Sequence, residues 1–256
     1  MTEGSKNVEG AVQETAGELA PTVFLSYPFG QKQEWIKHYA SSILSHWGYV
    51  VDDGSHFEGL SIADAVQRTI GRARTMVAFL TKRRKLVNGG WVSSDWVLQE
   101  IGFARGKDVP VIAIIEAGVD VKLGILSDVQ SIPLDPKAPY HSLIRLRSAL
   151  KSVLPNWNLP DEVRIEHIAQ PTTRESGKQW WDFWIWVDAS ASKLSEIVRV
   201  DYHYPPSFSP RDEEEKDRTY AFGNYGATNK EFMLEVVINF RNAPTQELDY
   251  RVTLDH

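Results

Sequence analysis

The sequence predicts an α/β domain built on a parallel sheet, followed by an all-β domain. Up to about residue 154, short apolar runs that favour strands alternate with stretches whose apolar residues recur at helical spacing. Beyond residue 178, strand-like runs follow one another with no long helical pattern between them. Apolar strands bounded by helices are typical of a parallel sheet covered on both faces. At 256 residues, the chain is long enough for two modest domains.

The first half contains five strand-like runs with helical patterns between them. The expected strands cover residues 22–27, 49–51, 75–80 and 109–115, with an edge strand near Ile132. The expected helices cover residues 33–47, 61–72, 94–105 and 143–154. Gly48 and Gly106 follow two of these helices, where glycine commonly ends a helix.

The second half alternates apolar and polar residues, which predicts a small antiparallel sandwich. Its strand-like runs cover residues 180–187, 197–204, 232–240 and 248–254, and residues 212–217 are expected to form a solvated acidic loop. The predicted organisation is a disordered polar leader over residues 1–20, an α/β domain over 21–154, a linker or edge segment over 155–177 and the sandwich over 178–256.

Composition argues against several classes of protein. The chain has no cysteine, which fits a reducing compartment, so we expect a cytoplasmic location. Its seven histidines lack metal-ligand spacing, and we expect neither a metal nor a cofactor. No apolar run is long enough to cross a bilayer, so no membrane partner is expected. Residues 161–256 carry 11 basic and 18 acidic side chains, which disfavours direct nucleic-acid binding.

Three segments are expected to meet at the carboxyl end of the sheet, where ligands of parallel α/β domains bind. They are the turn at residues 27–29, the loop at 53–60 and the start of the helix at 95–100. The spacing of Trp96, Glu100 and Phe103 places these three side chains on one stripe of that helix.

The two aromatic neighbours of Glu100 would partly desolvate its carboxylate and strengthen its interaction with a developing cation. An ordinary solvated helix glutamate is the alternative that the residues alone leave open.

The first half resembles a TIR domain over about residues 21–153. The resemblance is carried by residues 23–27, 48–74 and 109–115, and most specifically by residues 95–100, where Trp-x-x-x-Glu follows an acidic residue. It implies a flavodoxin-like fold, NAD as the substrate and Glu100 as the catalytic residue. The expected substrate-binding residues are Tyr27, Phe29, Asp53, Phe57, Asp95 and Trp96.

By this resemblance, Trp96 and Phe29 would pack around the nicotinamide or ribose, and Asp53 and Phe57 would belong to the loop that closes the site. A core role is the alternative for Trp96 and Phe29. The chemistry is compatible with one carboxylate, because nicotinamide leaves NAD as a neutral molecule and needs no proton donor.

One departure from the pattern concerns the turn after the first strand. Several active TIR enzymes have basic residues after the Ser-Tyr pair, where this chain has Pro28 and Phe29. Binding of the NAD pyrophosphate would then rest on backbone N–H groups or on another cation such as Lys32.

The second half resembles a prokaryotic YEATS domain, an immunoglobulin-like sandwich, over about residues 178–256. Phe208 and Tyr225 stand where related domains place aromatic ligand-binding loops, and these two residues are the expected ligand-contacting positions. The match departs at Pro206, which replaces a histidine of the family, and at Tyr225, which replaces a tryptophan.

Together, the two resemblances imply a sensor joined to an effector, as in bacterial anti-phage proteins that deplete NAD. We expect an NAD glycohydrolase or NAD-consuming cyclase that acts as a homo-oligomer through the TIR-like domain, with an unidentified ligand or protein bound by the sandwich. A non-catalytic scaffold for self-association is one alternative. A nucleoside deoxyribosyltransferase-like enzyme, also built on a related sheet with one glutamate, is the other.

Overall fold

The computed structural model describes residues 20–30, 34–55, 62–87, 89–120, 126, 129–135, 139–155, 157, 162–173 and 179–254. The expected leader therefore lies outside the described residues, except for Ala20. No helix in the described ranges combines the length and the apolarity needed to cross a bilayer.

A five-stranded parallel sheet forms the centre of the first half, as the sequence predicts. Its strands are β1 (Thr22–Ser26), β2 (Val50–Asp52), β3 (Thr75–Leu80), β6 (Val111–Glu116) and β7 (Gln130–Leu134). They are ordered β2-β1-β3-β6-β7, and every neighbouring pair is parallel. This strand order is the flavodoxin-like one, in which the topological switch lies between β1 and β3.

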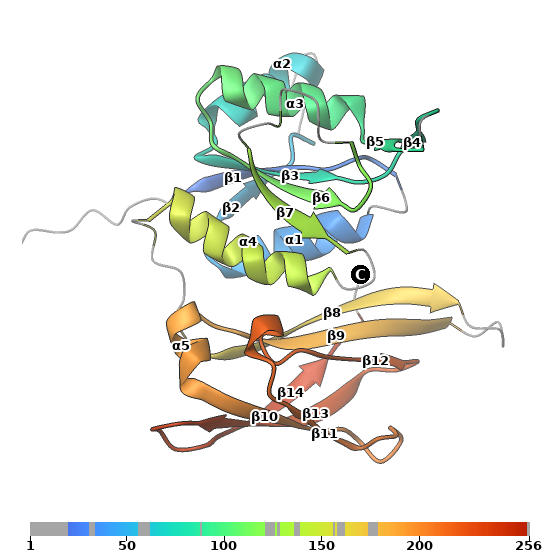
Figure 1. Ribbon diagram of the computed structural model, residues 1–256, viewed down its shortest axis with the longest axis vertical. Helices are drawn as coiled ribbons and strands as arrows, with labels where there is room; N and C mark the ends of the chain where they lie inside the picture. The colour runs from blue at the N-terminus through green and yellow to red at the C-terminus, as the bar shows by residue number, and fades with distance from the viewer. Residues whose placement is uncertain are drawn as a thin grey trace, which may run out of the picture.

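Two helices cover each face of this sheet (Figure 1). The helices are α1 (Glu34–His46), α2 (Ile62–Arg72), α3 (Asp95–Gly106) and α4 (Tyr140–Val153). Successive side chains of β1 point to opposite faces of the sheet. Phe24 packs in the apolar cluster beneath α2 and α3, whereas Val23 and Leu25 pack in the cluster with α1 and α4. A short hairpin of β4 (Arg84–Lys85) and β5 (Trp91–Val92) precedes α3.

The second half consists of two antiparallel sheets packed against each other (Figure 1). A three-stranded sheet has the order β12-β9-β8, and a four-stranded sheet has the order β11-β10-β13-β14. The bounds are β8 (Arg164–Thr173), β9 (Gln179–Asp188), β10 (Ile197–His203), β11 (Asp212–Glu215), β12 (Asn224–Thr228), β13 (Phe232–Phe240) and β14 (Gln246–Val252), with a short helix α5 (Ala191–Glu196) and a 3₁₀ turn (Arg218–Tyr220).

Three of these strands, β8, β11 and β12, lie outside the runs that the residues predict as strands. Residues 155–177 contain β8, a ten-residue edge strand whose charged residues and Pro171 obscure its apolar pattern. The acidic run expected as a loop forms β11, also at a sheet edge. Its four acidic residues disfavour strands, but backbone pairing with β10 and solvent on the open side make the strand tolerable there.

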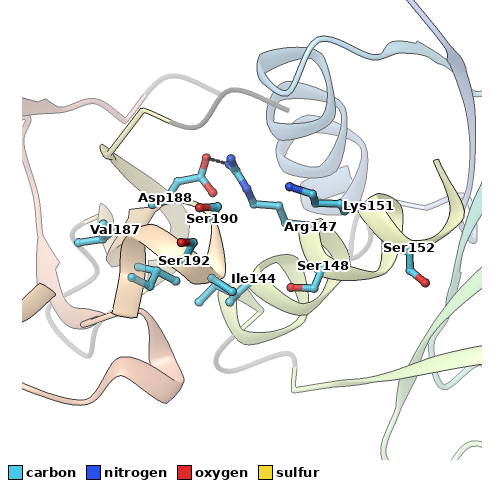
Figure 2. Close-up of a pocket in the computed structure, with 12 residues that line it drawn as sticks. Ile144, Arg147, Ser148, Lys151, Ser152, Val187, Asp188, Ser190 and Ser192 are labelled. Atoms are coloured by element: carbon cyan, nitrogen blue, oxygen red, sulfur yellow. Dashed lines mark hydrogen bonds and ion pairs between the residues drawn. The ribbon is translucent and has the colours of Figure 1, made fainter. Parts of the chain in front are cut away.

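The two halves share one apolar cluster. It joins residues of α1 and α4 to residues of β8 and β9, including the stacked rings of Tyr140 and Trp186. Arg147 of α4 forms a buried ion pair with Asp188 of β9 (Figure 2). The Trp47 indole donates a 3.0 Å hydrogen bond to the same carboxylate. A cavity of about 530 Å³ opens beside this pair, between α4 and the chain around α5.

Candidate active site

Glu100 lies on α3 with its carboxylate held at the carboxyl end of β1. Its side chain is only 6% exposed, which excludes the solvated helix glutamate that the residues alone left open. The hydroxyl of Ser26, the last residue of β1, donates a 2.5 Å hydrogen bond to Oε2 of Glu100. The carboxylate is therefore fixed by the sheet as well as by its own helix.

The electrostatic setting of Glu100 favours its neutral form more than water does. The pKa of Glu100 is raised to about 7, mainly because burial disfavours the charged form, with a smaller contribution from the negative charge of Asp53. Hydrogen bonds from Ser26 and from the Trp96 indole lower the pKa and so oppose this effect. A carboxylate with a pKa near neutrality can be an anion at one stage of a reaction and accept a proton at another.

Asp53 is anchored beside the site by groups from two other segments. The hydroxyl of Tyr27 donates a 3.0 Å hydrogen bond to Oδ2 of Asp53, and Nζ of Lys37 lies 3.2 Å from the same oxygen. Burial raises the pKa of Asp53, but hydrogen bonds from Ser55, Lys37 and Tyr27 outweigh it and hold the pKa below its usual value. Asp53 therefore supplies a fixed negative charge close to Glu100.

The other side chains expected to bind the substrate differ in how exposed they are. Phe29 is 55% exposed, with its ring 5.6 Å from that of Tyr27, so it is not a core residue. Trp96 is half-buried and packs against the cluster beneath α2 and α3. Asp95 is exposed in the first turn of α3, where its charge complements the helix dipole. Phe57 and Lys32 lie outside the described residues.

A small cavity of about 70 Å³ gives access to Glu100 between α2 and α3. Its lining consists of Ala63, Val66, Gln67, Ile70, Trp96, Gln99, Glu100 and Phe103. The two rings of this lining lie one helical turn on either side of the carboxylate. The volume is too small for a whole dinucleotide, since sites for small molecules commonly measure hundreds of cubic ångströms. A ligand that reaches Glu100 must therefore extend beyond this cavity.

Phe208 and Tyr225, the expected ligand positions of the second half, line a common cavity of about 390 Å³. Phe208 packs in an aromatic cluster, with its ring centre 5.1 Å from that of Tyr204 and 4.7 Å from that of Phe232. Tyr225 is 76% exposed at the rim. The two residues thus offer one fixed ring and one ring in solvent.

The fold also assembles a polar cluster that sequence spacing could not reveal. His46, Glu166 and Asp188, from three separate elements, bring ligand atoms within 4.8 Å of one another, a geometry compatible with a metal ion. Cations already occupy this cluster, because Arg164 lies 2.9 Å from Nε2 of His46 and Arg147 pairs with Asp188. The positive charges of these two guanidinium groups would repel a divalent cation. We therefore interpret the cluster as an ion-pair network between the two halves of the chain.

Comparison with known proteins identifies no family. No family model matches the sequence, and no curated protein matches it. Similar solved structures include the CMP N-glycosidase BcmB of Clostridium botulinum, which is 18% identical over 49% of this chain and 98% of that chain, with a TM-score of 0.35. The TIR domains of the activated Roq1 resistosome are 17% identical over 54% of this chain and 74% of that chain, with a TM-score of 0.31.

Translation elongation factor SelB of Methanococcus maripaludis is 9% identical over 78% of this chain and 46% of that chain, with a TM-score of 0.36. All three TM-scores are below 0.5 and all three identities are at most 18%. None of the similarities therefore indicates an activity for this chain, and a functional assignment depends on the site itself.

Proposed function

We propose that this protein is a nucleotide N-glycohydrolase that cleaves the nicotinamide–ribose bond of NAD, with Glu100 as the catalytic residue of a TIR-like domain. The observation that carries the proposal is the buried carboxylate of Glu100, fixed by Ser26 and open to a cavity lined by aromatic rings. A preorganised anion in a dry site interacts strongly with a positive charge that forms beside it.

The reaction needs little else from the protein. The bond between the ribose C1′ and the nicotinamide nitrogen breaks, and its electron pair leaves with nicotinamide, which becomes neutral. The resulting oxocarbenium-like sugar is stabilised by ionised Glu100. A water molecule then adds to C1′ and loses a proton, for which a carboxylate with a pKa of about 7 is a suitable acceptor. In the cyclase variant, a nucleophile of the same nucleotide takes the place of water.

Supporting roles follow from the contacts around the carboxylate. Asp53, held by Tyr27 and Lys37, adds negative potential beside the developing sugar cation. Trp96 packs beside the ribose or nicotinamide and donates to Glu100. Phe29, exposed next to Tyr27, is placed to cover an incoming ring.

The second half is proposed to act as the sensor of this effector. Two antiparallel sheets support an immunoglobulin-like, YEATS-like sandwich, and the cavity beside Phe208 and Tyr225 has the size of a small-molecule site. In this proposal, a ligand or protein bound there triggers homo-oligomers of the TIR-like domain to consume NAD, as in bacterial anti-phage defence.

The test is nicotinamide release from NAD by the full chain at high protein concentration, measured by chromatography. Glu100→Gln should reduce the rate at least 100-fold, while Glu235→Gln, an exposed carboxylate on β13, should leave it unchanged. Release that is indifferent to Glu100→Gln would overturn the proposal. Free base released from deoxynucleosides would favour the deoxyribosyltransferase-like alternative, and self-association without turnover under every condition would favour the scaffold.

A further inference from the structure

A basic groove continues from the Glu100 cavity along the outer surface of α2 and α3. It measures about 410 Å³ and is lined by Asp64, Gln67, Arg68, Gly71, Arg72, Phe103 and Lys107. Gln67 and Phe103 line both spaces, so the groove begins where the cavity of Glu100 ends. The three cations outnumber the one acid of the lining, in a chain whose formal net charge is −6.

The three cations of this groove are available to a ligand. Arg68, Arg72 and Lys107 are exposed, and no ion pair joins any of them to another residue in the described ranges. Nζ of Lys107 lies 5.7 Å from the centre of the Phe103 ring, which directs its charge back toward Glu100. A ligand anion in the groove would therefore meet unpaired positive charge.

We propose that this groove binds the phosphate groups of the nucleotide whose glycosidic bond faces Glu100, so that the substrate is a nucleotide and not a free nucleoside. This inference rests on the proposed function. The groove also supplies cations for the phosphates, which the turn after β1 does not supply because Pro28 and Phe29 stand there.

The order of side chains along α3 matches the order of groups in such a substrate. Trp96 lies one turn before Glu100, Phe103 one turn after it and Lys107 two turns after it, about 10 Å along the helix axis. A nicotinamide ring beside Trp96 and a ribose at Glu100 would place the phosphates beyond Phe103. Lys107 from α3 and Arg68 and Arg72 from α2 then approach the phosphates from both sides of the groove.

Helix dipoles offer a simpler explanation for part of this charge. Arg72 and Lys107 lie at the C-terminal ends of α2 and α3, where cations are favourable without any ligand. Arg68 lies a full turn before the end of α2, where that effect has faded. The dipoles therefore account for Arg72 and Lys107 but not for Arg68, whereas an anion in the groove accounts for all three.

The test compares two substrates that differ by one phosphate, nicotinamide mononucleotide and nicotinamide riboside. The quantity measured is the ratio of kcat/KM for the mononucleotide to kcat/KM for the riboside, from nicotinamide release. The triple variant Arg68→Gln, Arg72→Gln, Lys107→Gln should lower this ratio at least tenfold relative to the unmodified chain. Arg74→Gln removes an exposed cation outside the groove and should keep the ratio.

A binding measurement separates this inference from the proposed function. Inorganic pyrophosphate, titrated calorimetrically into the unmodified chain, the triple variant and Arg74→Gln, should bind at least tenfold more weakly to the triple variant alone. If the triple variant loses pyrophosphate binding but the unmodified chain releases no nicotinamide, phosphate binding in the groove is supported and the proposed NAD activity is contradicted. If nicotinamide release depends on Glu100, but the unmodified chain and the triple variant bind pyrophosphate equally and have equal substrate ratios, the proposed activity is supported and phosphate binding in the groove is contradicted. Circular dichroism confirms that each variant is folded.

Discussion

The Ser26 hydroxyl and the Glu100 carboxylate, 74 positions apart in the chain, are joined by a 2.5 Å hydrogen bond. Ser26 ends a central strand and Glu100 belongs to the helix that follows another strand, so the bond ties the helix to the carboxyl end of the sheet. It also provides a donor that favours the charged form of a carboxylate otherwise kept neutral by burial. The ionisation of Glu100 is therefore adjustable by single substitutions around it.

Replacing Ser26 by Ala should shift the pH dependence of nicotinamide release upward. The unmodified chain is expected to gain activity as pH rises through about 7, because only ionised Glu100 stabilises the sugar cation. Loss of a hydrogen bond to a charged group costs about 1.5 kcal/mol, which raises the pKa by about one unit, so activity at pH 7 should fall about fivefold and recover at pH 9. The measurement is kcat/KM between pH 5 and 9.

Asp53→Asn should shift the pH profile of nicotinamide release in the opposite direction and so serves as a control. The charge of Asp53 raises the pKa of Glu100, so its removal should move the same pH profile downward. Shifts of both variants in the same direction would contradict the assignment of the profile to Glu100.

Glu100→Gln should stabilise the protein at alkaline pH. Burial raises the pKa of Glu100 to about 7 in the folded state. Between about pH 4.5 and 7, the folded state therefore keeps the proton of Glu100 while the unfolded state releases it. The free energy of unfolding falls over that range as pH rises. The neutral amide avoids this loss, which is at most on the order of 3 kcal/mol. Urea unfolding should show a clearly larger gain at pH 8 than at pH 5, and an equal gain at both pH values would contradict the burial of a charge.

Arg147→Ala should destabilise the junction of the two halves by about 3–5 kcal/mol, because it leaves the buried Asp188 carboxylate without its cation. The Trp47 indole remains as a neutral donor to that carboxylate and cannot replace the charge. Arg145→Ala, an exposed position on the same helix, is the matched control and should change stability by about 0.5 kcal/mol or less. Equal thermal shifts for the two variants would show that the ion pair contributes nothing.

Gly226→Ala should destabilise the sandwich through overpacking. A Cβ at this position would lie 2.7 Å from the ring of Phe183, which packs against the rings of Tyr204, Phe208 and Phe232. Displacement of a ring in a packed cluster costs about 1–3 kcal/mol. Gly106→Ala meets no atom within 4 Å and serves as the control. A melting temperature unchanged by Gly226→Ala would show that the aromatic cluster is loosely packed.

The fold follows from the sequence wherever a strand is buried on both faces or alternates regularly. The bounds of β3 and β13 coincide with the predicted runs, because β3 is buried throughout and β13 alternates buried and more exposed side chains. Edge strands such as β8, β11 and β12 give no such signal. In β8, charged and polar residues interrupt the buried Ile165, Ile168 and Ala169, while β11 and β12 are short strands with few buried side chains.

The candidate site is only partly readable from the sequence. Helical spacing places Trp96, Glu100 and Phe103 on one stripe, and the structure has all three lining one cavity. The contact of Ser26 with Glu100 and the basic groove depend on how separate elements pack, which no local pattern encodes.

The apolar cluster that runs from α1 and α4 into β8 and β9 has a consequence for dissecting the protein. Cutting the chain ahead of β8 would expose to water a helical face that now includes Trp47, Leu146 and Leu150. The first half produced alone should consequently aggregate unless another surface covers this face, and heat should melt both halves together. Any change in the packing of the sandwich would therefore be transmitted to the first half through side chains in direct contact.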